Sequence, residues 1–371
     1  LNDLRGKSLE KCRGIAKTKR RRVSLCRLSL KGDSGMIRYI VKRLLLGILV
    51  LFGVTVITFS ITHLLPSDPA RSWAGAKATE EQVAAARIEL GLDKPIHVQF
   101  ANYISDLLHG DLGVSYTSRR PITAEMAEAV PATLELVFYA IFFGIILGVI
   151  MGVFAAKYKN GILDHLVRIF AIGSASIPSF VFAMVLQLIF FQQLGWLPLG
   201  GRLSTTATIL YNVPNITGWL TIDSLLVGNF ALFQDALLHL ILPAIPIAVY
   251  PAGTVARMTR SSLVEVLNED YIMAARSYGI SESKVLWKSA LKNTIGTTAT
   301  VAALSIGYTL VGTFLVESIF GWPGIGKFMS DSVTSLDYPA IMGATLFSTV
   351  AYLILNLIAD IIVALDPRVR V

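Results

Sequence analysis

Apolar residues along the chain gather in six long stretches that are separated by polar loops. The stretches cover residues 44–65, 134–156, 169–194, 237–255, 294–316 and 341–364, and they contain almost no charge. Each stretch approaches the length of about 20 residues that a helix needs to cross ~30 Å of hydrocarbon. The pattern therefore predicts an all-α, polytopic membrane protein with six transmembrane helices.

The charges in the loops predict which side of the membrane each loop faces. Basic residues are concentrated before the first stretch, in the loop 157–168, in the loop 256–293 and after the last stretch. The loops 195–236 and 317–340 contain one basic residue each, and the loop 66–133 is long enough to cross regardless of its charge. Because basic loops remain in the cytoplasm, both termini are predicted to be cytoplasmic.

The loop 66–133 has the signals of a small folded piece outside the cytoplasm. Thr79 and Gln82 have the spacing of a capping box, and the helix that they begin is expected to end at Gly91. A second helix is expected over residues 95–110. Ordered structure on the outer face would suit the docking of another protein.

Ionisable and kinking residues within the spans are few. His63, Glu135, His239 and Glu317 lie at the ends of spans, where the headgroup region is expected to hold them. No chain of carboxylates recurs as in a proton relay, which disfavours an ion-coupled secondary transporter but leaves it as an alternative. Prolines occur in the third and fourth spans, at Pro178, Pro243, Pro246 and Pro251. Because proline kinks a helix, these spans suit a bundle that opens and closes around a path.

The composition agrees with a membrane protein. The chain has 371 residues, of which 54% are hydrophobic and 16% charged, against about 45–50% and 25% in a soluble domain. The net charge of +8 comes from one tail, because residues 1–43 carry +11 and the remainder −3. Attraction to anionic lipid and the positive-inside rule explain such a tail. Membrane lipid is therefore predicted as a partner, and nucleic acid is not. Cys12 and Cys26 have no metal-binding spacing, and no metal site is predicted.

Residues 1–35 are expected to form a basic, disordered tail, and they lack the apolar run of a secretory signal. At Met36 the sequence changes to M-I-R-Y-I-V-K-R and continues directly into the first span. We hypothesise that Met36 is the natural start and that residues 1–35 are an upstream extension. A genuine cytoplasmic tail is the alternative. Residues 36–371 would then form the transmembrane domain.

The predicted cytoplasmic loop 256–293 contains a helix, a glycine turn and a second helix. Small residues in the first helix would let the two helices approach closely, and a glycine after it can adopt the positive φ of a turn. A serine can cap the second helix, and two basic residues can make polar contacts at the rim. These are Ala274 and Ala275, Gly279, Ser281, and Arg276 and Lys284. Such a loop can lie along the inner face and present a short knob to a soluble partner.

The loop resembles the coupling loop, or EAA loop, of permease subunits of binding-protein-dependent ABC importers, in particular of the dipeptide and oligopeptide permease family. Eight other stretches agree with that family in order: L-P-S-D-P-A at 65–70, L-G-L-D-K-P at 90–95, G-D-L-G-V-S at 110–115, P-A-T-L-E-L at 131–136, L-G-W-L-P at 194–198, F-G-W-P-G-I-G at 320–326, D-Y-P at 337–339 and L-D-P-R-V-R at 365–370. The resemblance covers essentially residues 36–371.

The chain departs from the family pattern at three places. Met273 stands where the general pattern has Glu before the Ala pair, although the peptide branch is often non-acidic there. Gly296 and Thr297 stand where relatives usually carry Leu-Pro, so the start of the fifth span is expected to bend differently. The loop 195–236 is longer than usual, and its role stays open.

The resemblance implies a permease subunit that is not an enzyme and binds no cofactor itself. ATP and Mg²⁺ would be bound by two separate ATP-binding subunits. A second homologous permease and an extracytoplasmic substrate-binding protein would complete an importer in a bacterial or archaeal cytoplasmic membrane. Di- or oligopeptides are the implied substrates, with nickel chelates, glutathione or oligosaccharides as alternatives.

The resemblance also implies where the ATPase subunits act. ATPase coupling is expected at Tyr271, Ala274, Ala275, Arg276, Gly279, Ser281 and Lys284. The transport path is expected to be lined by the third to fifth spans, and the substrate-binding residues are unknown.

One glycine-rich run looks like a nucleotide site. G-W-P-G-I-G-K-F at 321–328 fits most of the phosphate-loop pattern, but Phe328 stands where Mg²⁺ binding needs Ser or Thr, and no strand is predicted before it. We expect a tight glycine turn between the fifth and sixth spans. The five histidines are scattered over different spans and loops, which disfavours a membrane-embedded enzyme.

Overall fold

The computed structural model of the protein describes residues 40–62, 68–75 and 77–365. The chain divides into two units between Phe52 and Gly53, and the described part of the first unit, residues 40–52, is helical. The predicted tail 1–35 and the proposed start at Met36 lie outside the described residues, as does the end of the chain after Leu365.

Regular structure in the described residues is helical, apart from one isolated antiparallel bridge between Val114 and Pro121. The first helix is Ile40–Thr62. It is followed by α2 (Pro69–Ala74), α3 (Glu80–Glu89), α4 (Ile96–Leu108), α5 (Ile122–Lys157), α6 (Ile162–Ser176), α7 (Ser179–Leu186), a π-helical segment (Gln187–Gln193), α8 (Thr205–Leu210), α9 (Leu220–Leu226), α10 (Phe230–Val266), α11 (Asp270–Ser277), α12 (Glu282–Lys284), a second π-helical segment (Val285–Ala290), α13 (Leu291–Phe320), α14 (Ile325–Thr334) and α15 (Tyr338–Leu365).

Four single helices in the described residues are long and apolar enough to cross a membrane: Ile40–Thr62, α5, α10 and α15 over Tyr338–Ile358. Two bent pairs also pass: Ile162–Ser176 with Ser179–Gln193, bent by 108°, and Glu282–Thr309 with Gly312–Phe320, bent by 54°. The described chain thus has four candidate spans, or six if each bent pair crosses once.

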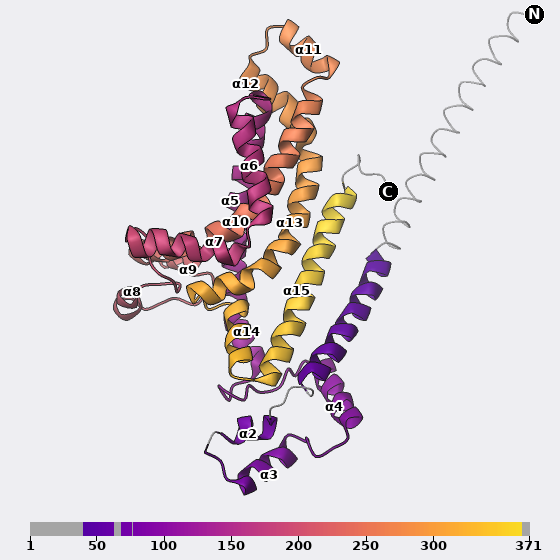
Figure 1. The fold of residues 1–371 in the computed structure, drawn as a ribbon, viewed down its shortest axis with the longest axis vertical. Coiled ribbons are helices and arrows are strands. Elements are labelled where there is room, and N and C mark those ends of the chain that lie inside the picture. The colour runs from indigo at the N-terminus through magenta and orange to yellow at the C-terminus, as the bar shows by residue number, and fades with distance from the viewer. Residues whose placement is uncertain (1–39, 63–67, 76, 366–371) are drawn as a thin grey trace, which may run out of the picture. The chain divides into compact units, whose positions relative to one another are not determined.

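The predicted third span, 169–194, is not one straight helix. Its bend falls at Ile177 and Pro178, between α6 and α7. Ile177 has an extended backbone, with φ −90° and ψ 122°, because a following proline disfavours the helical conformation. The proline that was expected to kink this span thus lies at a break in the helix, and α7 turns away from α6 (Figure 1).

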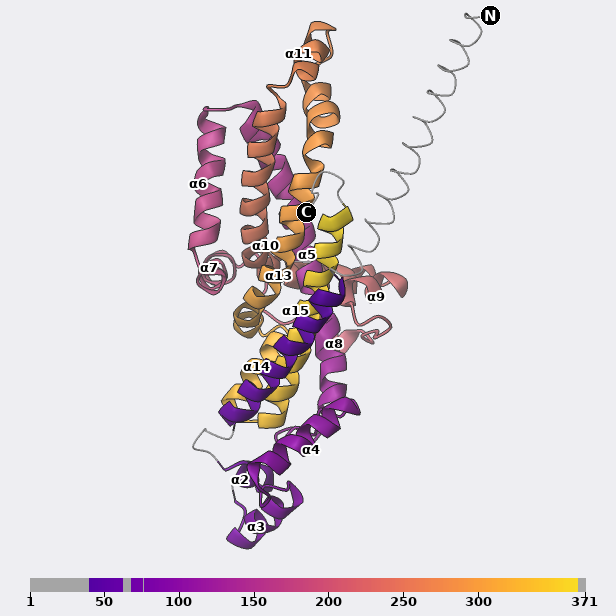
Figure 2. The same cartoon turned by 90° about the vertical axis from the view of Figure 1, so that its right-hand side faces the viewer.

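Helix α10 lies at the centre of the second unit, where it packs against α5, α6 and α13 (Figures 1 and 2). Gly144, Gly148 and Gly152 of α5 face α10, and a Cβ atom at Gly148 would lie 2.6 Å from the carbonyl oxygen of Ala252. Glycines spaced by four residues let two membrane helices approach backbone to backbone. The contact between α5 and α10 therefore depends on the absence of side chains at these positions.

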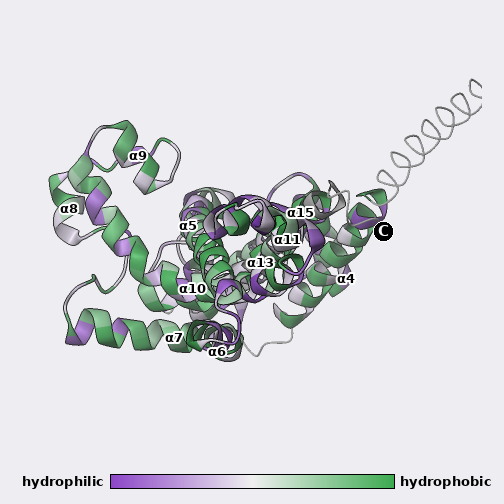
Figure 3. Cartoon of the chain, turned by 90° about the horizontal axis from the view of Figure 1, so that it is seen from above, coloured by the Kyte–Doolittle hydropathy of each residue, from purple (hydrophilic) through white to green (hydrophobic). Residues whose placement is uncertain are grey.

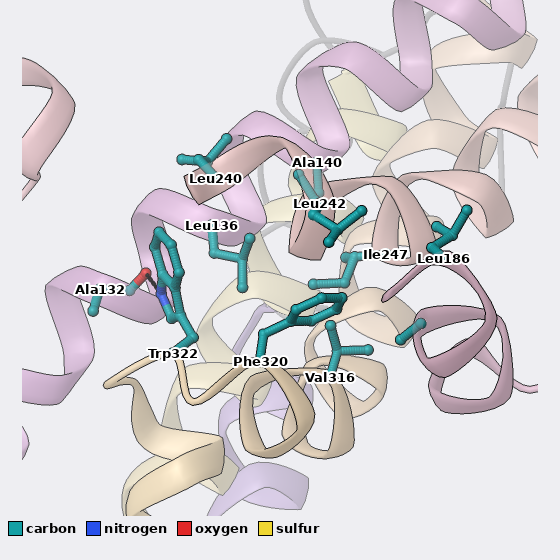
Figure 4. Close-up of a cluster of buried hydrophobic side chains, with 12 residues drawn as sticks. Ala132, Leu136, Ala140, Leu186, Leu240, Leu242, Ile247, Val316, Phe320 and Trp322 are labelled. Atoms are coloured by element: carbon teal, nitrogen blue, oxygen red, sulfur yellow. Dashed lines mark hydrogen bonds between the residues drawn. The ribbon is translucent and has the colours of Figure 1, made fainter. Parts of the chain in front are cut away.

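An apolar core forms where α5, α10 and the end of α13 meet. Its larger side chains are Leu136, Leu240, Leu242, Ile247, Val316, Phe320 and Trp322 (Figure 4). The indole N–H of Trp322 donates a hydrogen bond to the carbonyl oxygen of Ala132, at 2.8 Å. The chain after α13 is thereby held against the first half of α5.

The predicted folded piece in the loop 66–133 contains both expected helices. Thr79 and Gln82 form the capping box, with the Gln82 amide donating to Thr79 Oγ1 at 3.4 Å and the Thr79 amide donating to Gln82 Oε1 at 2.9 Å. The helix α3 ends before Gly91, whose φ is +65°, and α4 follows. The location of this piece outside the cytoplasm stays a prediction.

The acidic residues at the span ends are inside the protein. Glu135 and Glu317 are fully buried, and His239 is 5% exposed. Glu135 pairs with Arg202, and its Oε1 accepts hydrogen bonds from the amide and hydroxyl of Thr221, at 2.8 and 2.6 Å. Protein groups therefore satisfy these side chains, and their position at the depth of the headgroups stays a prediction. His63 lies outside the described residues.

An Arg202→Met substitution is expected to destabilise the protein by about 3–5 kcal/mol, since it leaves the Glu135 carboxylate buried without its cation. The double substitution Arg202→Met with Glu135→Gln removes the unpaired charge and is expected to recover part of that loss. Thermal unfolding in detergent of the two single variants and the double variant measures the coupling. Additive losses would show that the two side chains do not interact.

Candidate functional site

The chain between α10 and α13 folds as a helix, a turn and a helix at one end of the bundle (Figure 1). α11 is the first helix, and α12 continues through the second π-helical segment into α13. Gly279 lies between them with φ +75°. The predicted glycine turn is thus confirmed, because few residues other than glycine adopt this backbone conformation without strain.

The base of this loop is packed on the ends of two long helices. Ile272 of α11 and Val285 after α12 are fully buried, and they share one apolar cluster with Val153 of α5 and Leu263 of α10. Ala275 is half-buried against the same cluster. The loop is therefore a fixed part of the bundle end, and a force on it would act on α5 and α10.

Four of the predicted coupling residues have defined surroundings. Ala275 lies at the base of the loop, but Ala274 is exposed, so only one of the two alanines is in the packing between helices. The Arg276 guanidinium pairs with Glu282 across the turn, with Nε 2.7 Å from Oε1. The phenolic oxygen of Tyr271 accepts a hydrogen bond from the Asn293 side-chain amide, at 2.6 Å.

The remaining three predicted coupling residues, Gly279, Ser281 and Lys284, are exposed on the loop. Ser281 occupies the position before α12, but its side chain makes no capping hydrogen bond. The expected side-chain cap is therefore absent, and the backbone amide of Val285 donates to the Ser281 carbonyl oxygen at 3.0 Å. Whether an ATPase contacts any of the seven residues stays a prediction.

Large apolar side chains on the same loop were missed by the sequence reasoning. Their exposed fractions are 52% for Met273, 87% for Tyr278, 41% for Ile280 and 42% for Trp287. We name these four residues the coupling surface, after the coupling role that the family resemblance predicts for this loop. Exposed apolar side chains that are gathered on one small loop indicate an interaction site. The signal in the sequence was the aromatic residue directly before the glycine turn.

A cavity of about 640 Å³ lies between α6, α7, α10 and α13. Its walls are mostly apolar, and the polar groups among them are the side chains of Ser174, Ser179, Tyr250, Tyr308 and Thr309. The rings of Tyr250 and Tyr308 are 6.0 Å apart. The cavity is thus lined by the third, fourth and fifth predicted spans, which are the spans expected to form the path.

The helices that line the cavity are the helices that carry the coupling loop. α10 contributes Pro246 and Tyr250 to the cavity and continues to Leu263 at the base of the loop. α13 leaves the other end of the loop and contributes Tyr308 and Thr309. A displacement of the loop would therefore move two walls of the cavity together.

An ion pair joins α6 to α10 between the cavity and the coupling loop. Asp164 is fully buried, and the Arg260 guanidinium donates two hydrogen bonds to its carboxylate, at 2.6 and 2.8 Å. The backbone amide of Asn160 donates a third, at 2.9 Å. Because a bidentate pair is strongly oriented, it holds α6 and α10 in one relative position.

The glycine-rich run 321–328 binds a carboxylate from its own chain. Helix α13, not a strand, precedes it, and Gly321 forms a left-handed turn with φ +58°. At the N-terminus of α14, the Gly326 amide donates to Glu317 at 2.7 Å. A helix N-terminus favours an anion, and here Glu317 occupies that place. Among the described residues, no group of three or more His, Cys, Asp or Glu side chains could hold a metal ion.

Comparison with known families covers most of the chain. Residues 144–371 match the family described as "Binding-protein-dependent transport system inner membrane component". Residues 36–137 match the family described as "Binding-prot-dependent transport system membrane comp, N-term".

Curated relatives agree over nearly their whole length. The chain is 43% identical over 323 residues to the probable D,D-dipeptide transport system permease protein DdpB of Escherichia coli (strain K12), covering 87% of this chain and 94% of the relative. It is 39% identical to the di/tripeptide transport system permease protein DppB of Pseudomonas aeruginosa, covering 90% and 99%. It is 37% identical to the glutathione transport system permease protein GsiC of Salmonella typhimurium, covering 90% and 99%. The chain therefore belongs to the family of inner membrane components of binding-protein-dependent transport systems.

Proposed function

We propose that the chain is a non-catalytic permease subunit of an ATP-driven importer, and that it carries di- or oligopeptides across a bacterial or archaeal cytoplasmic membrane. The observation that carries the proposal is the direct connection of the coupling surface to the cavity through α10 and α13. The names of the relatives, two of which are di- or tripeptide permeases, support peptides as the substrate.

In this proposal the chain supplies the path and other subunits supply the energy. We count each bent pair as one span, which gives six, and we propose that both termini and the coupling loop are cytoplasmic and that the piece 66–133 is outside. Two ATPase subunits bind ATP and Mg²⁺, and one of them contacts the coupling surface. An extracytoplasmic binding protein delivers the substrate, and a second homologous permease completes the path.

The mechanism follows from the cavity and the loop. When the ATPase subunits close on ATP, movement at the coupling loop reaches α10 and α13, whose residues form two walls of the cavity. The cavity is large enough for a small ligand, since ligand pockets are about 300–1,000 Å³. Its few hydroxyl groups can form hydrogen bonds to a peptide backbone without selecting one side chain, and selection is left to the binding protein.

Purification of the protein from its native membrane, followed by reconstitution into liposomes, tests the function. We expect two ATPase chains, a second permease and a binding protein to be recovered with it. Uptake of a labelled dipeptide should require ATP and the binding protein. A homogeneous preparation that transports without any bound ATPase would overturn the proposal.

The same liposomes distinguish the substrate classes. We expect a labelled dipeptide or tripeptide to be taken up. Unlabelled glutathione is the competitor for that uptake, because one relative is a glutathione permease. Identification by mass spectrometry of the ligand retained by the binding protein gives an independent answer. A retained nickel chelate or oligosaccharide would exclude peptide transport and leave the ATP-driven importer intact.

A further inference from the structure

A second pocket, separate from the cavity, is lined by the first half of α5, the loop 195–236 and the region of α14. Its volume is about 710 Å³, and no described residue lines both it and the cavity. Figure 3 shows α8 and α9 to one side of the bundle, and Thr208 and Asp223 of these helices belong to the pocket wall. The loop 195–236, whose role the sequence left open, thus forms part of a pocket with the volume of a ligand site.

The pocket contains many charged side chains, and all but one of them are bonded within the chain. The bonded groups are Arg120 with Glu128, Lys327 with Asp331, Arg202 with Glu135, and Asp223 with the backbone amides of residues 216–218. Glu125 is the charged residue that remains. Arg120 attracts it, but the hydrogen bonds of that guanidinium go to Glu128. The buried Oε2 of Glu125 has no hydrogen-bond partner among the described residues.

A second polar atom of the pocket wall is also unsatisfied, and it is a donor. Arg202 uses its Nη2 group for Glu135 and for the carbonyl oxygen of Gly218, which is 2.8 Å away. Its Nε is buried and has no partner in the described part of the chain. Buried polar groups without a partner are costly and few in native proteins. Here a pocket holds one such acceptor from α5 and one such donor from the loop 195–236.

These two atoms need a ligand that carries the opposite groups. A carboxylate oxygen accepts from a cationic donor such as an ammonium group, and an arginine N–H donates to a carboxylate. A free peptide has both groups, one at each end of its chain. The apolar side chains of the pocket wall can contact its side chains; they are Leu203, Val213, Leu220 and Phe328. The pocket therefore fits a short zwitterionic peptide.

We infer that this pocket is an outer binding site for the transported peptide, which places its ammonium group at Glu125 and its carboxylate at Arg202. The inference rests on the proposed function. The pocket adjoins the start of α5, whereas the coupling loop packs on Val153 near the other end of that helix. In the proposed orientation the peptide therefore meets this pocket before the cavity. Because the described lining of the cavity has no charged side chain, the two termini find complementary charges in the outer pocket instead.

Photolabelling of the assembled importer tests the inference. A dipeptide with a diazirine side chain is added to the importer in nanodiscs, without ATP and without the binding protein, and mass spectrometry locates the labelled residues. We expect label in the outer pocket, and at least about tenfold less with the N-acetylated dipeptide or in Glu125→Gln, because each change removes a charge-assisted hydrogen bond. Glu81→Gln changes an exposed glutamate of α3 and is the matched control. An unlabelled pocket, or equal labelling by both dipeptides, would overturn the inference.

A lipid headgroup could supply the same chemistry, because phosphatidylethanolamine carries an ammonium group and a phosphate. The labelling is therefore repeated in nanodiscs in which phosphatidylethanolamine replaces phosphatidylcholine. We expect the same amount of peptide label in both. Displacement of the dipeptide by phosphatidylethanolamine would assign the pocket to a headgroup and contradict the peptide site.

Transport in liposomes gives a readout that a merely structural role of Glu125 would not change. In Glu125→Gln we expect the loaded binding protein still to stimulate ATP hydrolysis. Dipeptide uptake per ATP should fall at least about threefold, because the released peptide loses a hydrogen bond to a charged group. An unchanged ratio would count against the outer site. The two proposals fail separately: a wild-type preparation without ATPases refutes the importer, whereas ATP-driven dipeptide uptake with an unlabelled pocket refutes the outer site alone.

Discussion

A Tyr278→Asp variant is expected to reach the membrane in normal amount, but its rate of ATP-driven uptake is expected to fall at least about tenfold. The reason is that loss of a central aromatic contact would weaken the proposed interface with the ATPase by about 2 kcal/mol or more. Tyr278 is 87% exposed at the tip of the coupling loop, so the substitution removes little from the fold of the chain itself. The measurement is dipeptide uptake in liposomes, with ATP hydrolysis recorded in the same samples.

Two controls separate the coupling surface from general damage. Tyr278→Phe keeps the ring and is expected to retain most of the uptake. Ile88→Asp places the same charge on an exposed apolar residue of α3 and is expected to leave the coupling of hydrolysis to uptake unchanged. Normal uptake by Tyr278→Asp would remove the coupling surface from the proposed mechanism, although the assignment to the family would stand.

A Gly148→Leu variant is expected to yield little folded protein. A Cβ atom at residue 148 would lie 2.6 Å from the Ala252 carbonyl oxygen and 2.9 Å from the Val255 Cβ. The first of these is a backbone atom, which cannot rotate away, so α5 and α10 must separate. Overpacking costs typically about 1–3 kcal/mol where side chains can adjust, and we expect more at a backbone contact. Size-exclusion chromatography and thermal unfolding in detergent measure the loss.

The matched control for this substitution is Gly53→Leu. Gly53 is also a helical glycine, but no atom lies within 4 Å of a Cβ atom built there. We expect this variant to be recovered as the folded protein in normal yield. Equal yields from Gly53→Leu and Gly148→Leu would show that α5 and α10 do not depend on the close approach of their backbones.

Several elements followed from local patterns in the sequence. The apolar stretches located the long helices, the capping box at Thr79 began α3, and Gly279 formed the turn of the coupling loop. These features depend on residues close together in the chain, such as a cap with the third residue of its helix. Eight short motifs in order and the coupling loop indicated the family, which the comparisons show.

Other features were misjudged or missed because they depend on residues far apart in the chain. The sequence located Glu135 at the end of a span but did not identify its partners Arg202 and Thr221, which are more than sixty residues away in the sequence. Pro178 predicted a kink in the third span, but the change of helix direction by 108° there depends on what the two halves pack against. The glycines of α5 at 144, 148 and 152 were visible in the sequence, but nothing local identified α10 as the helix against which they pack.

The sequence by itself determined that the chain is a helical membrane protein of a known transport family, because hydrophobic length, turn residues and short motifs are local properties. The tertiary structure alone decided which side chains of the coupling loop are exposed, that α10 and α13 connect this loop to the cavity, and that Glu135 pairs with Arg202. The physical reason is that burial and pairing depend on which helices meet, and those contacts join positions that the chain order separates.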